Sequence, residues 1–238
     1  MTGTGNVHEA EIARIRAEYE RRGRELPADF YTWNRPVNLF HHCQTLRSCI
    51  RALVSEGMFP LDGRLIADIG CGRGQWLTEF LQWGAYGCDL CGIDLDEERI
   101  QVARRRIASA DLRVGDASRL PWPDATFDLL TQFTLLTSVL DAGMKWQIAA
   151  EMLRVVKPDG LILWYDFRCN NPLNPNVRGI AAKEIRSLFP GCVVRLESVT
   201  LAPPAARRVV PLSWLAALVL EKVPLLRTHY LGVIRKQH

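Results

Sequence analysis

From residue 63 onward, short apolar segments alternate with longer segments in which apolar residues recur at helical spacing. The apolar segments predict strands at 64–69, 90–94, 111–114, 127–133, 160–166, 192–200 and 228–235. The helical spacing predicts helices at 74–83, 96–109, 143–157, 180–188 and 212–221, with a turn at 158–160 before the fifth strand. Strands that alternate with helices are typical of a parallel sheet covered by helices on both faces. We therefore predict an α/β fold with a doubly wound, seven-stranded, mostly parallel sheet.

The region before residue 63 has a different pattern, with apolar residues at helical spacing among many charges. Residues 8–25 predict a mostly exposed helix, docked loosely at the edge of the domain, and 37–56 predict a second helix. We therefore expect an N-terminal helical cap at 1–62 and the main domain at 63–238. Within the main domain, a helical insertion at 201–227 precedes the last strand, and we expect it to act as a lid.

The composition is that of an ordinary globular chain of 238 residues, with 48% hydrophobic and 24% charged residues. It excludes collagen-like, coiled-coil and wholly disordered proteins. The seven cysteines follow no disulfide framework, and Cys88-x-x-Cys91 has no second pair or histidines at zinc-binding spacing. We expect reduced thiols, no metal site and a cytoplasmic location. The first thirty residues lack the apolar region of a signal peptide, and the longest apolar run, 214–220, is too short to span a membrane.

A glycine-rich turn follows the first predicted strand, with glycines at 70, 72 and 74. Glycine lets a backbone turn sharply and approach a ligand closely, so a nucleotide-like cofactor belongs at this turn. The spacing Gly-x-Gly-x-Gly differs from the dinucleotide pattern Gly-x-Gly-x-x-Gly. Asp68 lies two residues before the first glycine, where its carboxylate repels a pyrophosphate but suits a cation such as an ammonium group. A tight turn without a ligand is the structural alternative.

Acidic residues also stand at the ends of the next two predicted strands. Asp94 ends the second strand, twenty residues beyond Gly74, where a carboxylate accepts the two hydrogen bonds of a ribose diol. Asp96 sits at the N-cap of the helix that follows, so we assign it a structural role. Asp116 follows the third strand. These ends meet at one edge of the sheet, which is where open α/β folds hold ligands.

Taken together, these motifs resemble the class I S-adenosylmethionine-dependent methyltransferases, over about residues 63–166. The matching motifs are Asp68-x-Gly70-x-Gly72-x-Gly74, Asp94, Gly115-Asp116-Ala117, Phe127-Asp128 and the run 153–160. Within that family the chain is similar to the small-molecule branch (methyltransferase type 11), typified by the ubiquinone and menaquinone biosynthesis methyltransferases. The resemblance implies a Rossmann-like fold, S-adenosyl-L-methionine as cofactor, and in-line methyl transfer to a small-molecule metabolite.

The resemblance also implies a role for each matching position. Asp68 and the turn Gly70, Cys71, Gly72 and Gly74 would hold the methionine end of the cofactor, Asp94 its ribose hydroxyls, and Leu95 would lie against the adenine. Asp116 would accept from the adenine amino group while the Ala117 N–H serves a ring nitrogen, and Gln132 and Phe133 would face the sulfonium and the acceptor. The candidates for a general base are Tyr31, His41, His42 and Asp166, with His229 as a further histidine. Each histidine also fits a plain surface or core position.

The sequence after the fourth predicted strand lacks a motif that is typical of one class of methyl acceptor. The methyltransferases that act on exocyclic amines of DNA and RNA carry an Asn/Asp-Pro-Pro-aromatic motif there, whereas this chain has Gln132-Phe133-Thr134-Leu135. We therefore disfavour nucleic acid as the acceptor. The rival functions are a non-catalytic regulatory module that binds S-adenosylmethionine and a nicotinamide-dependent oxidoreductase, and the glycine spacing and Asp68 argue against the second.

The last 38 residues account for the net positive charge of the chain. The net charge is +4, and residues 201–238 hold six basic side chains against Glu221 alone. Arg207 and Arg208 precede the apolar run, and Lys222 follows it. For this segment a lid over the acceptor, a subunit interface, plain packing on the sheet and a peripheral membrane contact all remain open.

Overall fold

The computed structural model describes residues 4–27, 30, 32–171 and 174–237. Its helices are α1 (Thr4–Glu25), α2 (Pro36–Ser55), α3 (Gln75–Gln82), α4 (Glu97–Arg106), α5 (Ala142–Val155), α6 (Ala182–Leu188), α7 (Pro203–Val209) and α8 (Trp214–Glu221). Its strands are β1 (Ile66–Ile69), β2 (Leu90–Asp94), β3 (Asp111–Val114), β4 (Phe127–Phe133), β5 (Val156–Phe167), β6 (Cys192–Leu201) and β7 (Arg227–Lys236). Short 3-10 turns include η2 (Leu136–Ser138) and η3 (Pro224–Leu226).

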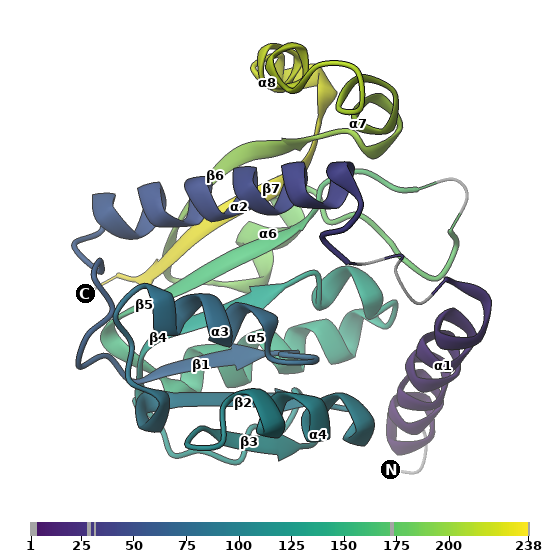
Figure 1. The fold of residues 1–238 in the computed structure, drawn as a ribbon. Helices are drawn as coiled ribbons and strands as arrows, with labels where there is room; N and C mark the ends of the chain where they lie inside the picture. Colours follow the sequence, from purple (N-terminus) through teal and green to yellow (C-terminus); the bar gives the residue numbers. More distant parts are fainter. Residues whose placement is uncertain (1–3, 28–29, 31, 172–173, 238) are drawn as a thin grey trace.

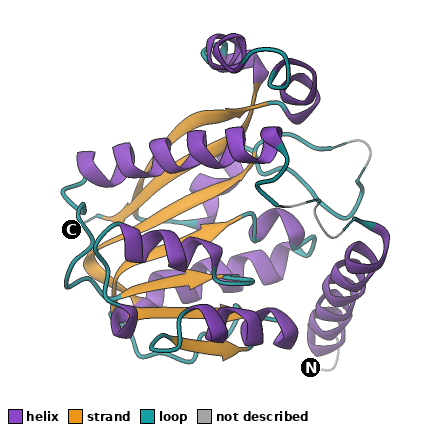
Figure 2. Ribbon diagram, viewed as in Figure 1, coloured by secondary structure: helices purple, strands orange, loops and turns teal. Residues whose placement is uncertain are grey.

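The seven strands form one sheet in the order β3-β2-β1-β4-β5-β7-β6 (Figure 2). Strands β1 to β5 are parallel, whereas β7 runs antiparallel to both β5 and β6. Helices cover both faces, with α2, α3 and α4 on one and α5 and α6 on the other (Figure 1). This confirms the predicted α/β class and the mostly parallel, seven-stranded sheet.

The central strands are buried on both faces, which explains their nearly continuous apolar sequences. All residues of β1 and β2 are buried, and their only charged residues, Asp68 and Asp94, stand near the carboxyl ends. Because β1 to β5 are parallel, their carboxyl ends share one edge of the sheet. We call it the carboxyl edge, and β6 also ends there because it is antiparallel to β7.

Strands β2, β3 and β4 begin and end where the sequence predicts. The turn at 158–160 is different, because β5 already begins at Val156, directly after α5. Val156 pairs with Phe127 and the next paired residues are Leu129 and Leu161, so the Pro-Asp-Gly segment is an irregularity within the strand. Pairing of Val156 with β4 overrides the local turn signal.

Two helical segments also differ from the expectation. α7 is a helix that the sequence analysis missed, because Pro203 and Pro204 read as breakers although proline is favoured in the first turn of a helix. α1 is mostly exposed, as expected, but it has one anchor in the core, since its Ile15 is only 5% exposed and packs in the core cluster that contains Leu136 and Ile148. Within the described residues, no helix is both long and apolar enough to cross a membrane.

Candidate functional site

Asp68 lies at the carboxyl edge between β1 and β4. Its side chain is 2% exposed and accepts a hydrogen bond of 2.7 Å from Thr131 Oγ1 on the neighbouring strand. Burial raises the pKa of Asp68 to about 7, because a carboxylate charge is poorly solvated there, and the charge of Asp94 acts in the same direction. The site therefore holds a carboxyl group that a nearby cation would ionise.

The turn after β1 folds back onto β2. The N–H groups of Gly70 and Cys71 both donate to Ile93 O, at 2.8 and 3.0 Å, and Gly72 N–H donates to Asp94 Oδ2 at 2.9 Å. Gly70 has φ +78°, and a Cβ there would come within 3.0 Å of Leu135 Cδ1. Gly72 has φ +52°, and only Asp94 Oδ2, at 4.0 Å, lies near its Cβ position. A side chain at 72 would thus project into the space in front of the Asp94 carboxylate.

Asp94 ends β2 with both carboxylate oxygens in use. Oδ1 accepts from Asp96 N–H at 3.0 Å and Oδ2 from Gly72 N–H. The side chain is buried, and this burial raises the pKa of Asp94 in spite of the two backbone donors. Each oxygen keeps a lone pair, so the fixed carboxylate retains the capacity to bind two adjacent hydroxyls. Leu95, the next residue, packs at the same edge against the core cluster that contains Ala117.

Asp116 follows β3 and is held by two donors from Ser118. Ser118 N–H donates to Oδ1 at 2.8 Å, Ser118 Oγ donates to Oδ2 at 2.6 Å, and His8 Nε2 of α1 lies 2.6 Å from the same Oδ2. Burial alone would raise the pKa of Asp116, but the bonds from Ser118 and His8 outweigh it and hold the pKa below its usual value. Asp116 is therefore a fixed carboxylate at the end of the third strand.

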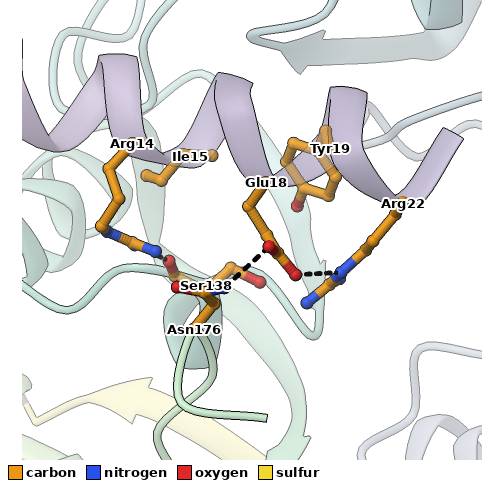
Figure 3. A pocket seen from close by; sticks show the side chains of 7 residues that line it. All are labelled: Arg14, Ile15, Glu18, Tyr19, Arg22, Ser138 and Asn176. Carbon is orange, nitrogen blue, oxygen red and sulfur yellow. Dashed lines mark hydrogen bonds and ion pairs between the residues drawn. The ribbon is translucent and has the colours of Figure 1, made fainter. Parts of the chain in front are cut away.

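Helix α1 lies along the carboxyl edge, as Figure 1 shows. Glu11 accepts from the backbone N–H groups of Leu140 and Asp141, and Arg14 donates to Ser138 O at 2.6 Å. Figure 3 shows the shallow pocket beneath the helix, where Glu18 accepts from Asn176 Nδ2 at 2.7 Å. Polar side chains of α1 thus cover part of the carboxyl edge. The sequence analysis missed them because α1 reads as an exposed, charged helix.

An aromatic wall lies at the carboxyl edge on the α2 and α3 side of the sheet. Trp76, at the start of α3, stacks on Phe133 with centroids 3.8 Å apart, and Phe133 lies 5.9 Å from Tyr165. Tyr165 in turn stacks on His229 of β7 at 4.7 Å and an interplanar angle of 9°. We call Trp76, Phe133, Tyr165 and His229 the aromatic wall. It is a row of aromatic rings on the same face of the sheet as Asp68 and Thr131, and its Tyr165 and His229 are buried.

His229 is part of this wall, and the partly buried His41 lies close to it. Burial lowers the pKa of His229 to about 3, with a further contribution from His41, and lowers the pKa of His41 to about 4. Both rings are therefore neutral near pH 7. His41 Nε2 is buried and finds no hydrogen-bond partner among the described residues. A buried ring nitrogen without a partner is costly unless a bound group satisfies it.

The other predicted bases are placed differently. His42 Nε2 lies 3.0 Å from Glu79 Oε1, and its ring stacks on Trp33 at 4.3 Å. Asp166 is a correction, because alternation along β5 turns it to the opposite face from Tyr165. There the hydroxyl and N–H of Thr137 both donate to Asp166, and burial raises its pKa to about 7. Tyr31 lies outside the described residues.

Gln132 and Phe133 also separate, although we expected both to face the reacting groups. Phe133 belongs to the aromatic wall, but Gln132 is fully buried on the other face of β4. Its Nε2 donates to Tyr165 O at 3.4 Å and its Oε1 accepts from Leu135 N–H at 3.1 Å. Gln132 therefore fixes the turn after β4. The sequence analysis did not name Ser118, His8 or Thr131. Ser118 could have been found from its position two residues after Asp116, whereas no sequence pattern pointed to His8 or Thr131.

Comparison with known proteins agrees with this arrangement. Residues 66–160 match the family model of a methyltransferase domain. The 27-O-demethylrifamycin SV methyltransferase of Amycolatopsis mediterranei is 30% identical over 146 residues, which cover 58% of this chain and 50% of the relative. The demethylmenaquinone methyltransferase of Listeria monocytogenes is 30% identical over 122 residues, which cover 49% and 48%. The chain thus spans about half the length of the curated relatives it matches.

Solved structures match the fold. The crystal structure of a SAM-dependent methyltransferase from Archaeoglobus fulgidus superposes with a TM-score of 0.57, covering 81% of this chain and 94% of that one at 16% identity. At this identity the likeness concerns the fold, including the helices and strands outside the matched family region.

Proposed function

Because residues 66–160 form a class I S-adenosylmethionine-dependent methyltransferase domain, we propose that the protein transfers a methyl group from S-adenosylmethionine to a small-molecule acceptor. The observation that carries this proposal is the row of carboxylates Asp68, Asp94 and Asp116 at the ends of β1, β2 and β3. A ligand that carries an ammonium group, a ribose diol and an adenine amino group presents hydrogen-bond donors and a positive charge. A row of carboxylates complements such a ligand and repels a phosphate-bearing one.

Each carboxylate has a distinct task in this proposal. Asp68 and the backbone at Gly70 and Gly72 bind the methionine end, since a buried carboxyl group gains a partner in the ammonium cation. Asp94 binds the ribose hydroxyls through its remaining lone pairs, with Leu95 against the adenine. Asp116 and the Ala117 N–H bind the adenine edge. The cofactor, when bound, supplies an electrophilic methyl group on a sulfonium sulfur.

The aromatic wall positions the acceptor in this proposal. Trp76 and Phe133, which stack on each other, form an apolar pair that excludes water from the reacting groups and aligns a planar or apolar acceptor with the methyl group. His41 Nε2 accepts a hydrogen bond from the hydroxyl or amine of the acceptor. This bond orients the nucleophilic atom of the acceptor, and the imidazole takes up its proton. Its lowered pKa keeps this lone pair free of a proton at neutral pH.

The small-molecule assignment is supported by the names of the relatives. One acts on a demethylrifamycin and another on demethylmenaquinone, and both are small organic molecules. The sequence after β4 supports it too, because the Asn/Asp-Pro-Pro-aromatic motif is absent there. The side chain of Gln132 instead accepts a hydrogen bond within the turn after β4.

The test separates binding from catalysis. We expect calorimetry to show one S-adenosylmethionine site per chain, and the Asp94→Ala variant to bind the cofactor more weakly. Asp159→Ala, which removes an exposed carboxylate near the start of β5 and thus at the end of the strand opposite the carboxyl edge, is the matched control and should bind like the wild type. Incubation with labelled cofactor and a metabolite extract should then yield a methylated small molecule. Binding without turnover would favour a regulatory module, and no binding would overturn the proposal.

A further inference from the structure

The α7–α8 segment stands clear of the main body at the end of the sheet, between β6 and β7 (Figure 1). Its inner side packs on a small cluster of its own, which consists of Phe40, Leu201, Ala206, Val210 and Ala217. The segment is therefore folded onto α2 and β6, and its position does not depend on the outer side chains.

The outer face of this segment is apolar and exposed. It consists of Leu212, Trp214, Leu215, Val219, Val223 and Leu225. Leu225 is 91% exposed, Leu212 86% and Leu215 72%. So many large apolar side chains exposed on one short segment of a folded protein mark an interaction site, because leaving them in water is unfavourable.

The fully exposed charges around this face are all positive. Arg207 and Arg208 end α7 and Lys222 follows α8, and each of the three is exposed. The one acidic residue of the segment, Glu221, is partly buried, and burial raises its pKa. The outer face therefore combines apolar side chains with a cationic rim.

The outer face also lies beside the acceptor side of the candidate site. Trp214 contacts Phe40 edge to face at 5.2 Å, and Phe40 lies 5.9 Å from His41. On the other side, η3 leads directly into β7, which carries His229 of the aromatic wall. Whatever occupies the outer face is thus next to the residues proposed to bind the acceptor.

We propose that the outer face docks on the surface of an anionic lipid bilayer. Leu212, Leu215 and Leu225 enter the boundary between head groups and acyl chains, while Arg207, Arg208 and Lys222 contact the anionic head groups. α8 has eight residues, so it lies on the bilayer rather than crossing it. The membrane contact stands on the outer face alone, whereas its consequence, an acceptor drawn from the membrane, rests on the proposed function.

Charge argues against a second copy of the chain on this face. A symmetric pairing would bring Arg207, Arg208 and Lys222 of one copy close to the same residues of the other. Like charges at a desolvated interface repel, and an anionic bilayer removes this repulsion. The lipid surface therefore fits both the apolar centre and the cationic rim.

Vesicle flotation tests the proposal with the full chain. We expect flotation with vesicles of phosphatidylcholine and phosphatidylglycerol at low salt, and much less with phosphatidylcholine alone. Arg207→Gln/Arg208→Gln should weaken the binding on the order of fivefold per cation removed. Leu215→Ser/Leu225→Ser should abolish flotation. The matched controls are Lys183→Gln/Arg186→Gln and Val54→Ser, which alter exposed side chains of α6 and α2 and should bind like the wild type.

Calorimetry with S-adenosylmethionine keeps the two proposals apart. All four variant proteins should bind the cofactor like the wild type, which also shows that they are folded. The membrane proposal is overturned if the wild type does not float with anionic vesicles, or if Leu215→Ser/Leu225→Ser floats unchanged. A third result would also overturn it: sedimentation shows that the wild type is a dimer and that Leu215→Ser/Leu225→Ser is not, while the wild type does not bind vesicles. Vesicle binding without any cofactor binding would overturn the proposed function alone.

Discussion

His8 Nε2 lies 2.6 Å from Asp116 Oδ2, a contact between residues 108 positions apart in the sequence. Ser118 donates to both oxygens of the same carboxylate, so His8 takes up a further lone pair of Asp116. Asp116 is the residue that we assign to the adenine amino group. Helix α1 therefore lies across the path by which a cofactor reaches the carboxyl edge.

His8→Ala should accelerate cofactor binding. The substitution removes the contact that ties the start of α1 to Asp116, and a hydrogen bond to a charged group in a partly exposed position is worth up to about 1.5 kcal/mol. We expect the association rate constant for S-adenosylmethionine to rise by about three- to tenfold, measured by stopped-flow fluorescence. Glu9→Ala, on the exposed side of α1, is the control. A slower association in His8→Ala would mean that His8 holds the cofactor rather than blocks it.

Asp94→Ala should weaken cofactor binding by about 1–3 kcal/mol, because two ribose hydroxyls lose their charged acceptor. Asp94→Asn, which keeps an acceptor oxygen for only one of the backbone N–H groups of Gly72 and Asp96, should lose less. Calorimetry gives both affinities, and circular dichroism checks the fold. Unchanged affinity in Asp94→Ala would remove this residue from the site.

Gly72→Val should abolish cofactor binding in a folded protein. The side chain would fill the space in front of Asp94, and φ +52° also strains a β-branched residue. Gly191→Val is the matched control, because Gly191 has φ +70° and open space around its Cβ position. We expect both variants to lose similar thermal stability, and only Gly72→Val to lose binding. Equal binding by the two variants would show that the glycine turn is purely structural.

Cofactor affinity should rise between about pH 5 and pH 7 through Asp68. In the free protein burial raises the pKa of Asp68 to about 7, and the ammonium group of the cofactor would lower it, so binding releases a proton. Calorimetry in two buffers of different ionisation enthalpy measures this release. Asp68→Asn should remove most of the release and the pH dependence, and a release that persists would assign it to another group.

The same shift gives a prediction about stability. A folded-state pKa above the unfolded value means that the folded protein binds the proton more tightly, so the contribution of Asp68 falls as pH rises from about 4 to 7. Asp68→Asn keeps an oxygen for the Thr131 hydroxyl and removes the buried charge. We therefore expect the free variant to melt at a higher temperature than the wild type at pH 8, and the difference to shrink at pH 5. An equal difference at both values would contradict the raised pKa.

His41→Ala should lower kcat by at least about tenfold while the affinity for S-adenosylmethionine stays within about twofold, because His41 touches the acceptor in the proposed site and not the cofactor. His41→Gln, which restores an acceptor oxygen, should recover part of the loss. The two variants are compared by steady-state kinetics once an acceptor is found. A loss of cofactor affinity as large as the loss of kcat would point to general packing.

The sequence predicts the centre of the sheet well because its signals there are local. Strands β2, β3 and β4 are bounded by glycine, proline and acidic residues, and their ends coincide with the predicted ones. The start of β5 was misplaced because Val156 pairs with Phe127 across the sheet, a contact that no local pattern reveals. α7 was missed because two prolines begin it.

The three carboxylates of the candidate site could also be predicted from local sequence signals. Asp68, Asp94 and Asp116 follow apolar strands, so topology alone brings them to one edge. The sequence does not reveal which face of β4 and β5 each residue occupies at that edge, because these strands are buried on both faces, so it could not show that Gln132 and Asp166 lie on the face opposite to Phe133 and Tyr165. The contacts of α1 join residues more than 100 positions apart, and its charged sequence gives no sign of them.

The way α1 is attached has a consequence for motion. Ile15 is the one buried apolar side chain of this helix among residues 7–25, and Ile12 and Tyr19 are only partly buried against the same cluster. The polar anchors of the helix are bonds of His8, Glu11, Arg14 and Glu18. Detaching α1 exposes little of the core, so it costs far less free energy than unfolding the sheet. Its backbone amides should exchange with solvent through their own local opening, well before those of β1 or β4. The carboxyl edge is thus uncovered by the fluctuation of one helix while the rest of the molecule stays rigid.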